Sequence, residues 1–171
     1  MTILAWGLLG SPPEMSSDLN RREVLQGVAM APALFVSHGS PRVALETDAY
    51  PHVARMGEAL RPLRSEGVVL MGSGGLTHNL RRLAWHDKSA PAETWAREFD
   101  GWLAEKLAAR DFLGLQSWAS APHAQLAHPS AEHLLPLFFV LGAALPEDRL
   151  PPVFEGFHYA TLSMRSFVLR G

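Results

Sequence analysis

Two short apolar runs, each followed by a loop that carries a histidine, constrain the fold of this chain most strongly. Residues 33–36 lead into a loop with His38, and residues 68–71 lead into a Gly-rich loop and then His78. Short apolar runs closed by Gly or Pro are typical of buried strands. The carboxyl ends of neighbouring parallel strands meet at one edge of an open α/β sheet, where ligands bind. We therefore expect both histidines at that edge.

Between and after these runs, the spacing of apolar residues predicts helices. Residues 53–63 have helical spacing, with Pro62 expected to bend or end the helix. Residues 95–110 carry a strong apolar stripe opposite a charged face. A third helix is expected to begin with Ser130 as N-cap, to hold His133 in its first turn and to run to residue 141.

Two further strands are expected near the carboxyl end, at residues 152–156 and 161–169. Strand, loop and helix then alternate along the chain, which is the order typical of α/β proteins. The sequence therefore predicts a single α/β domain with a mainly parallel or mixed sheet flanked by helices.

Residues 1–29 differ from the rest and are interpreted as an N-terminal extension, while the α/β domain is expected over residues 30–171. The string Asn20-Arg-Arg-Glu-Val-Leu25 resembles a twin-arginine export signal, so the extension could be a remnant of one. An intact signal also has an apolar segment and a cleavage site after the arginines. Here the apolar run merges with the strand predicted at 33–36. A cytoplasmic location is therefore expected, with export by the twin-arginine route as the alternative.

Composition excludes several kinds of site. The chain has no cysteine and eight histidines, so a transition-metal site would have to use imidazole and carboxylate ligands. The formal net charge of −2 gives no electrostatic reason to expect nucleic acid or an anionic membrane as a partner. No apolar run approaches the roughly 18 residues of a transmembrane helix. The oligomeric state stays open.

The remaining histidines are weighed by their positions. His128 and His133 are five residues apart, which does not place both on one helical face. Of the two, His133 is the favoured metal ligand, because His128 precedes the expected helix cap. His52 and His86 are interpreted as exposed. The other two, which have no partner visible in the sequence, are His123 and His158.

A serine hydrolase is the alternative from another enzyme class. Ser73 stands in a Gly-Ser-Gly string after a predicted strand. The nucleophile elbow of such enzymes has the pattern Gly-x-Ser-x-Gly, and Met71 occupies the place of its first glycine. This hypothesis is therefore not favoured.

Four strings in order carry a family resemblance. They are Pro32-Ala-Leu-Phe-Val-Ser-His-Gly-Ser-Pro41, Leu63 to Leu80 with Gly-Ser-Gly-Gly-Leu-Thr-His-Asn-Leu at its end, His128-Pro-Ser-Ala-Glu-His-Leu-Leu-Pro-Leu137, and Phe154-Glu-Gly-Phe-His-Tyr-Ala-Thr-Leu-Ser-Met164. Together they resemble the DOPA-dioxygenase type of the class III extradiol ring-cleavage dioxygenases. The resemblance covers nearly everything from Pro32 to Phe167.

The resemblance implies a site and a reaction. His38, His78 and His133 fall on metal-site histidines of the family, and the position of His78 is alternatively an acid–base residue. The implied metal is a divalent non-haem ion, Fe(II) for catalysis and Zn(II) as a further ion that can be bound. The implied reaction opens a catechol-type ring such as that of DOPA beside its two hydroxyls and inserts both atoms of O₂.

One part of the family pattern is missing. Between its first histidine string and the Gly-Ser-Gly string, the family has a further strand, another metal histidine and a proposed catalytic histidine. This sequence passes from one matching segment to the next near Tyr50-Pro51 and has neither histidine. We therefore expect a central part of the fold to be missing. The alternative function is a truncated, catalytically impaired metal-binding remnant of the family.

Overall fold

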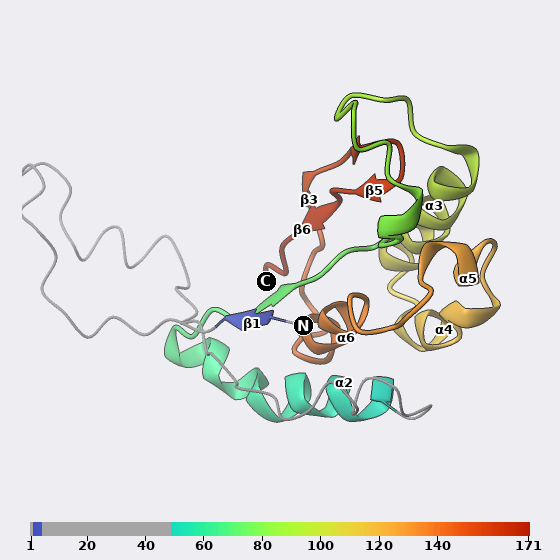
Figure 1. The fold of residues 1–171 in the computed structure, drawn as a ribbon. Coiled ribbons are helices and arrows are strands. Elements are labelled where there is room, and N and C mark those ends of the chain that lie inside the picture. Colours follow the sequence, from blue (N-terminus) through green and yellow to red (C-terminus); the bar gives the residue numbers. More distant parts are fainter. Residues whose placement is uncertain (1, 5–48) are drawn as a thin grey trace, which may run out of the picture.

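The computed structural model describes residues 2–4 and 49–171 (Figure 1). The strand predicted at 33–36, His38 and the Arg21-Arg22 pair lie outside these residues.

Two helices, α2 (Ala49–Leu60) and α6 (Leu135–Gly142), lie against each other along one side of the molecule (Figure 1). Two glycines set how closely they approach. A Cβ atom at Gly57 would lie 2.0 Å from the carbonyl oxygen of Phe139, and one at Gly142 would lie 2.0 Å from that of Ala54. Only a residue without a Cβ permits this backbone contact.

After α2 the chain tightens into the 3₁₀ helix η2 (Arg61–Glu66), with Pro62 in its first turn. The prediction that Pro62 ends the preceding helix is confirmed, since α2 stops at Leu60. Proline lacks the N–H that would continue the α-helical ladder.

Helix α3 (Thr94–Ala108) confirms the helix predicted at 95–110, and its buried stripe includes Phe99, Leu103 and Leu107. Helix α6 is apolar on nearly all sides, and its Phe139 is fully buried. The two helices contribute to one hydrophobic core. Shorter helical turns connect them: η3 (Leu80–Arg82), α4 (Phe112–Gln116), η4 (Trp118–Ser120) and α5 (Ala124–Ala127).

The third predicted helix begins later than expected. Residues 129–134 form turns, and α6 begins only at Leu135. The hydroxyl of Ser130 donates to the Glu132 carboxylate over 2.7 Å instead of capping a helix. Pro136 fits the first turn of a helix because no N–H is needed there. His133 therefore lies in a turn before the helix, and its predicted place in the first turn is wrong.

The strands form three two-stranded pieces. They are β1 (Thr2–Leu4) with β2 (Met71–Ser73), β3 (Pro152–Phe154) with β6 (Ser166–Phe167), and β4 (Phe157–His158) with β5 (Leu162–Ser163). In the first piece Thr2 faces Ser73 and Leu4 faces Met71. In the third, His158 faces Leu162.

Every pairing between these strands is antiparallel, which differs from the mainly parallel or mixed sheet expected. Three residues join β4 to β5, and so short a connection can only return the chain antiparallel. The other strand expected to end at the same edge, at 33–36, lies outside the described residues. Helices with small sheets remain compatible with the α/β class. No helix in the described part of the chain is long and apolar enough to cross a bilayer.

Candidate functional site

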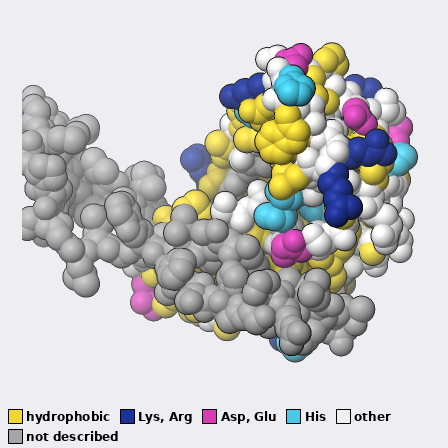
Figure 2. All heavy atoms as spheres, in the orientation of Figure 1, with side chains coloured by type: hydrophobic (Ala, Val, Ile, Leu, Met, Phe, Trp, Pro, Cys, Tyr) yellow, Lys and Arg dark blue, Asp and Glu magenta, His cyan; other side chains and the backbone are white. Residues whose placement is uncertain are grey.

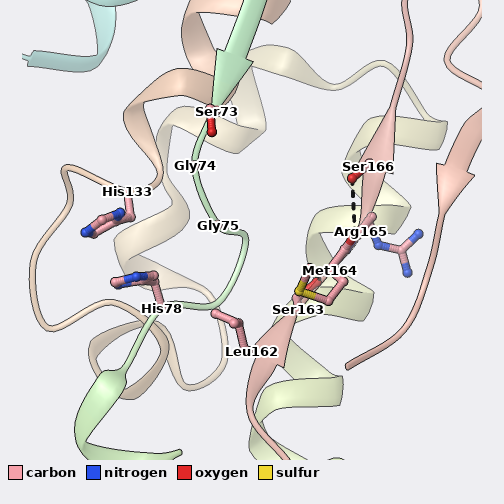
Figure 3. Close-up of a pocket in the computed structure, with 10 residues that line it drawn as sticks. All are labelled: Ser73, Gly74, Gly75, His78, His133, Leu162, Ser163, Met164, Arg165 and Ser166. Atoms are coloured by element: carbon pink, nitrogen blue, oxygen red, sulfur yellow. Dashed lines mark hydrogen bonds between the residues drawn. The ribbon is translucent and has the colours of Figure 1, made fainter. Parts of the chain in front are cut away.

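A cavity of about 380 Å³ lies where β2 ends. One wall consists of residues 73–75 with His78 and His133, and the other is the strand segment 162–166 (Figure 3). The face seen in Figure 2 carries several histidine side chains with hydrophobic and Lys or Arg side chains beside them. Two of the three histidines predicted for the site therefore line one cavity, and the third, His38, lies outside the described residues.

The imidazole rings of His78 and His133 stack on each other. Their centroids are 3.5 Å apart and their planes differ by 20°. Both rings project from loops on the same side of the cavity (Figure 3). Residues 55 positions apart in the chain thus present two imidazoles to one point in the cavity.

Hydrogen bonds between two loops bring these rings together. The N–H of His78 donates to the carbonyl of Ala127 over 2.9 Å, and that of Gly75 donates to the carbonyl of His133 over 2.9 Å. The side-chain amide of Asn79 donates to the carbonyl of Leu126 over 2.8 Å. The loop after β2 is therefore fastened along the segment 126–133.

His128 makes a fourth hydrogen bond between the two loops. This bond holds its ring away from the cavity. Its ring is buried, and Nε2 lies 2.9 Å from the carbonyl oxygen of Leu76. A carbonyl only accepts, so Nε2 carries the proton of the neutral ring. Burial lowers the pKa of His128 to about 4, which keeps that ring neutral near pH 7. The preference for His133 over His128 as a site residue agrees with this placement.

Gly74 allows the two loops to touch. A Cβ atom there would lie 2.2 Å from the carbonyl oxygen of His133. Any other residue would push the turn that carries His133 away from the strand end. The Gly-rich string after β2 is therefore needed for close backbone approach, which the sequence alone did not reveal.

Burial also favours the neutral form of both cavity imidazoles. It lowers the pKa of His78 below its ordinary value, although the Glu132 carboxylate acts in the opposite direction. Burial and the neighbouring His78 ring lower the pKa of His133. Both rings are therefore neutral near pH 7, and a neutral imidazole can bind a metal or accept a proton.

The opposite wall is positioned by a buried threonine. The hydroxyl of Thr77 donates to the carbonyl of Thr161 over 2.6 Å and accepts from the N–H of Ser163 over 2.6 Å. Thr77 is fully buried. Because Thr77 directly precedes His78, its two hydrogen bonds set the distance between the wall that carries His78 and His133 and the facing segment 162–166.

Behind that strand, Asp100 of α3 anchors two of its residues. The Ser163 hydroxyl donates to Asp100 over 2.6 Å, and Nη2 of Arg165 donates to it over 2.8 Å. Arg165 also pairs with Glu155. Residues 163 and 165 thus point toward α3, and Met164 between them faces the cavity (Figure 3).

The donor set fits part of a transition-metal site. Two adjacent neutral imidazoles are ligands that zinc and iron accept. Within residues 2–4 and 49–171, however, no three His, Asp or Glu side chains gather so as to hold a metal ion. A complete site would need a donor from outside the described residues, and His38 is the predicted one.

The other histidines and Ser73 lie as follows. His52 and His86 are exposed, as expected. His123 pairs with Glu98 over 2.6 Å, a partner that the sequence did not indicate. Ser73 lines the cavity, but in the part of the chain described no hydrogen bond joins it to a histidine. The geometry thus gives no support to the serine hydrolase hypothesis.

Comparison with known proteins identifies relatives over most of the chain. Residues 32–168 match the family model described as the catalytic LigB subunit of aromatic ring-opening dioxygenase. A 4,5-DOPA dioxygenase extradiol of Portulaca grandiflora is 35% identical over 68% of this chain and 43% of its own length. One of Escherichia coli K12 is 34% identical over 74% of this chain and 48% of its own length.

A solved structure is also similar. The crystal structure of the uncharacterized protein JW3007 from Escherichia coli K12 superposes with a TM-score of 0.63 at 33% identity, covering 69% of this chain and 49% of that one. The chain thus spans about half the length of the relatives it matches.

Proposed function

The chain belongs to the LigB family of aromatic ring-opening dioxygenases, and from this premise we propose that it catalyses metal-dependent extradiol cleavage of catechol-type aromatics. The reaction would insert both atoms of O₂ beside the two hydroxyls. Residues 30–171 would form the catalytic domain, and the family match over 32–168 supports these bounds.

DOPA is the substrate that we propose to test first. The relatives from Portulaca grandiflora and Escherichia coli carry DOPA in their names. A 35% identical relative from Hapsidospora irregularis is named only as the dioxygenase tasH, so ring substrates other than DOPA belong in the same assay.

We propose His38, His78 and His133 as the metal-binding residues, with Fe(II) as the catalytic ion and Zn(II) as an ion that the same ligands can hold. When bound by these residues, the ion would supply the place where the catechol and O₂ are brought together. The neutral state of the His78 and His133 rings supports this assignment, since protonated imidazoles cannot donate a lone pair.

His78 has a second role open to it. Its ring is partly buried, and its lowered pKa leaves it unprotonated near pH 7. It could then take the proton from one catechol hydroxyl at Nδ1 or Nε2 and return a proton when the ring opens. Leu162 and Met164 across the cavity offer apolar contact to an aromatic ring.

The stacked pair of His78 and His133 at an open cavity is the observation that carries the proposal. Calorimetric titration with Zn(II) should show one site in the wild type and at least tenfold weaker binding in His133→Ala and His38→Ala. His86→Ala, which removes an exposed histidine, is the matched control and should bind as the wild type does. Unchanged binding in all the site variants would refute the assigned ligands.

Catalysis is tested separately. Protein loaded anaerobically with Fe(II) should consume O₂ when mixed with DOPA and form a yellow ring-opened product. Under the proposed function, His78→Ala loses this activity whether His78 is a ligand or an acid–base residue. Retained Zn(II) affinity in His78→Ala would assign it the second role.

A catalytically impaired metal-binding remnant is the second candidate. Two observations favour it: the described residues bring together only two imidazoles, and the chain spans about half the length of its relatives. This candidate predicts Zn(II) binding without O₂ uptake by the iron-loaded protein. Turnover of any catechol would exclude it.

A further inference from the structure

Two apolar side chains, Leu162 and Met164, line the wall of the cavity that lies opposite His78 (Figure 3). Both residues are half-buried, while Thr161 and Ser163 beside them are buried. This alternation follows from the extended backbone, in which successive side chains point to opposite faces. A ring that enters the cavity would therefore meet Leu162 and Met164 on one side and the imidazoles on the other.

Hydrogen bonds hold the backbone of this wall in place. The N–H of Met164 donates to the carbonyl of Gly156 over 2.9 Å. The N–H of Ser163 donates to the buried hydroxyl of Thr77 over 2.6 Å, and its own hydroxyl donates to Asp100 over 2.6 Å. Because the backbone is fixed at these points, the wall can adapt to a ligand mainly by moving its side chains.

The two apolar side chains differ in their neighbours on the paired strand. His158 faces Leu162 in the pairing of β4 with β5, so these two side chains lie next to each other on one face. The same register places Gly156, which has no side chain, opposite Met164. Among the described residues other than its chain neighbours, a Cβ atom at Gly156 would meet only the ring of Phe154 within 4 Å. Met164 therefore has room to move on that side.

Methionine is a side chain suited to a wall that adjusts to its ligand. It is unbranched and flexible, and its thioether makes favourable contacts with aromatic rings. The cavity of about 380 Å³ is near the lower end of the roughly 300–1,000 Å³ usual for ligand sites. In a cavity of this size, the position of one side chain changes which ligands fit.

We propose that Met164 is a specificity-determining residue, whose side-chain conformation sets the size of the ring substituent that the cavity accepts. This inference rests on the proposed function, because the ligand is taken to be a catechol. It concerns the size of the substituent and not its charge, and it leaves ring cleavage to the residues on the opposite wall.

Binding of two neutral probes to the full chain tests this inference without turnover. Catechol and 4-tert-butylcatechol differ only in one bulky apolar substituent. Their dissociation constants are measured by calorimetry under nitrogen on Zn(II)-loaded protein. The quantity compared between variants is the affinity for 4-tert-butylcatechol relative to that for catechol, so a change that weakens both probes equally does not count.

Two substitutions should move this relative affinity in opposite directions. Met164→Ala enlarges the cavity, so the relative affinity for 4-tert-butylcatechol should rise by about tenfold. Met164→Ile nearly keeps the side-chain volume but is stiff at χ1, so the relative affinity should fall by about fivefold. Isoleucine also favours extended backbone, so this variant tests the inference even where alanine unfolds the protein.

Met56→Ala is the matched control. It makes the same chemical change on α2, where Met56 is 38% exposed and does not line the cavity. Its relative affinity for the two probes should equal that of the wild type.

The outcomes separate the two proposals. A relative affinity that stays at the wild-type value in both Met164 variants, with both probes still bound, would overturn this inference alone. A shift in the same direction in both variants, or an equal shift in Met56→Ala, would also overturn it, because the side chain at position 164 would not then set the size limit. Failure of the wild type to bind either probe would overturn the proposed function together with this inference.

Discussion

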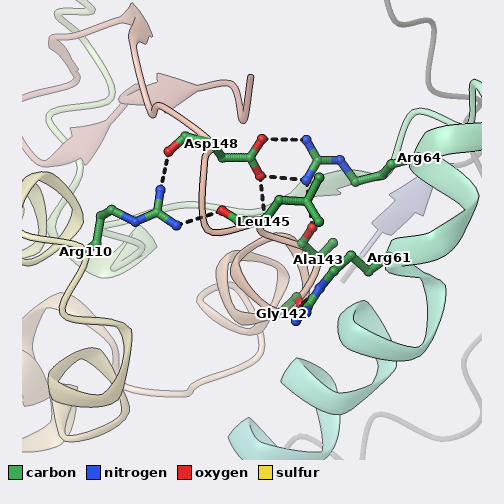
Figure 4. A network of polar contacts seen from close by, with 7 residues as sticks. All are labelled: Arg61, Arg64, Arg110, Gly142, Ala143, Leu145 and Asp148. Carbon is green, nitrogen blue, oxygen red and sulfur yellow. Dashed lines mark hydrogen bonds and ion pairs between the residues drawn. The ribbon is translucent and has the colours of Figure 1, made fainter. Parts of the chain in front are cut away.

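The guanidinium of Arg64 holds the buried carboxylate of Asp148 through two parallel hydrogen bonds, of 2.6 and 2.8 Å (Figure 4). The Asp148 side chain is fully buried, and that of Arg64 is 14% exposed. Arg64 also donates to the carbonyl of Ala143 over 2.8 Å, and Arg110 donates to the carbonyls of Leu145 and Asp148 from the other side. Segments far apart in the chain are therefore joined at the end of α6.

Replacing Arg64 by methionine should destabilise the protein strongly. The variant leaves the Asp148 carboxylate buried without its counter-charge, which costs about 3 kcal/mol in the free energy of unfolding. Urea denaturation at pH 7 measures this loss. The matched control is Glu58→Gln, which removes a 3.8 Å surface pair with Arg61 and should change stability by no more than about 0.5 kcal/mol. Equal effects in the two variants would contradict the role of the buried pair.

Substituting alanine for Gly57 should weaken the packing of α2 against α6. The new Cβ would lie 2.0 Å from the Phe139 carbonyl oxygen, so the helices must separate, at a cost of about 3 kcal/mol. Gly101→Ala is the control, because a Cβ at Gly101 meets nothing within 4 Å. It should stabilise helix α3 by about 0.5–1 kcal/mol. Thermal unfolding of both variants would show shifts of opposite sign.

Stability should fall as the pH drops from about 6.5 toward 4, and His128 should account for part of the fall. Its pKa is about 4 in the folded protein and 6.5 as its ordinary value. The unfolded chain therefore binds a proton in this range that the folded protein does not, so acid favours unfolding. The expected contribution is on the order of 3 kcal/mol.

Comparison of His128→Gln with the wild type isolates this contribution. Glutamine can still donate to the Leu76 carbonyl but does not titrate. Urea unfolding at pH 7.5, 6.0 and 4.5 should show a shallower loss of stability in the variant. Parallel curves for the two proteins would show that His128 does not titrate in this range.

Removing the Thr77 hydroxyl should loosen the site. Thr77→Val keeps the shape of the side chain but leaves the Ser163 N–H and the Thr161 carbonyl without their buried partner. The cost is about 2 kcal/mol in the free energy of unfolding. Zn(II) affinity should fall as well, because His78 is the next residue. Thr94→Val makes the same chemical change at an exposed position and should change stability by no more than about 0.5 kcal/mol.

Local patterns predicted two of the helices well. The apolar stripe in 95–110 predicted α3, and Pro62 marked the end of α2. The apolar run at 68–71 was displaced by about three residues from the strand observed at 71–73. Runs of alternating or apolar residues predict the ends of a strand poorly, because the pairing partner decides which residues form the ladder.

The arrangement of the site depended on contacts that local patterns do not encode. Asn79 makes one local bond, accepting from the Arg81 N–H over 3.2 Å. The bonds from Thr77 to Thr161 and from Asn79 to Leu126, however, bridge 84 and 47 positions of the chain. Ser130 looked like an N-cap but bonds to Glu132 instead. Pairwise bonds over such separations follow from the fold, which single-residue preferences do not determine.

The bond from Thr77 to Thr161 also places a limit on when the site can form. Both cavity histidines have been synthesised by residue 133. The strand that fixes the position of the loop carrying His78 is not complete until residue 163. A chain still emerging from the ribosome would therefore carry both histidines for some time before they are held at their final separation. A metal ion held by the two imidazoles at that separation would therefore be bound only after residue 163 has been added.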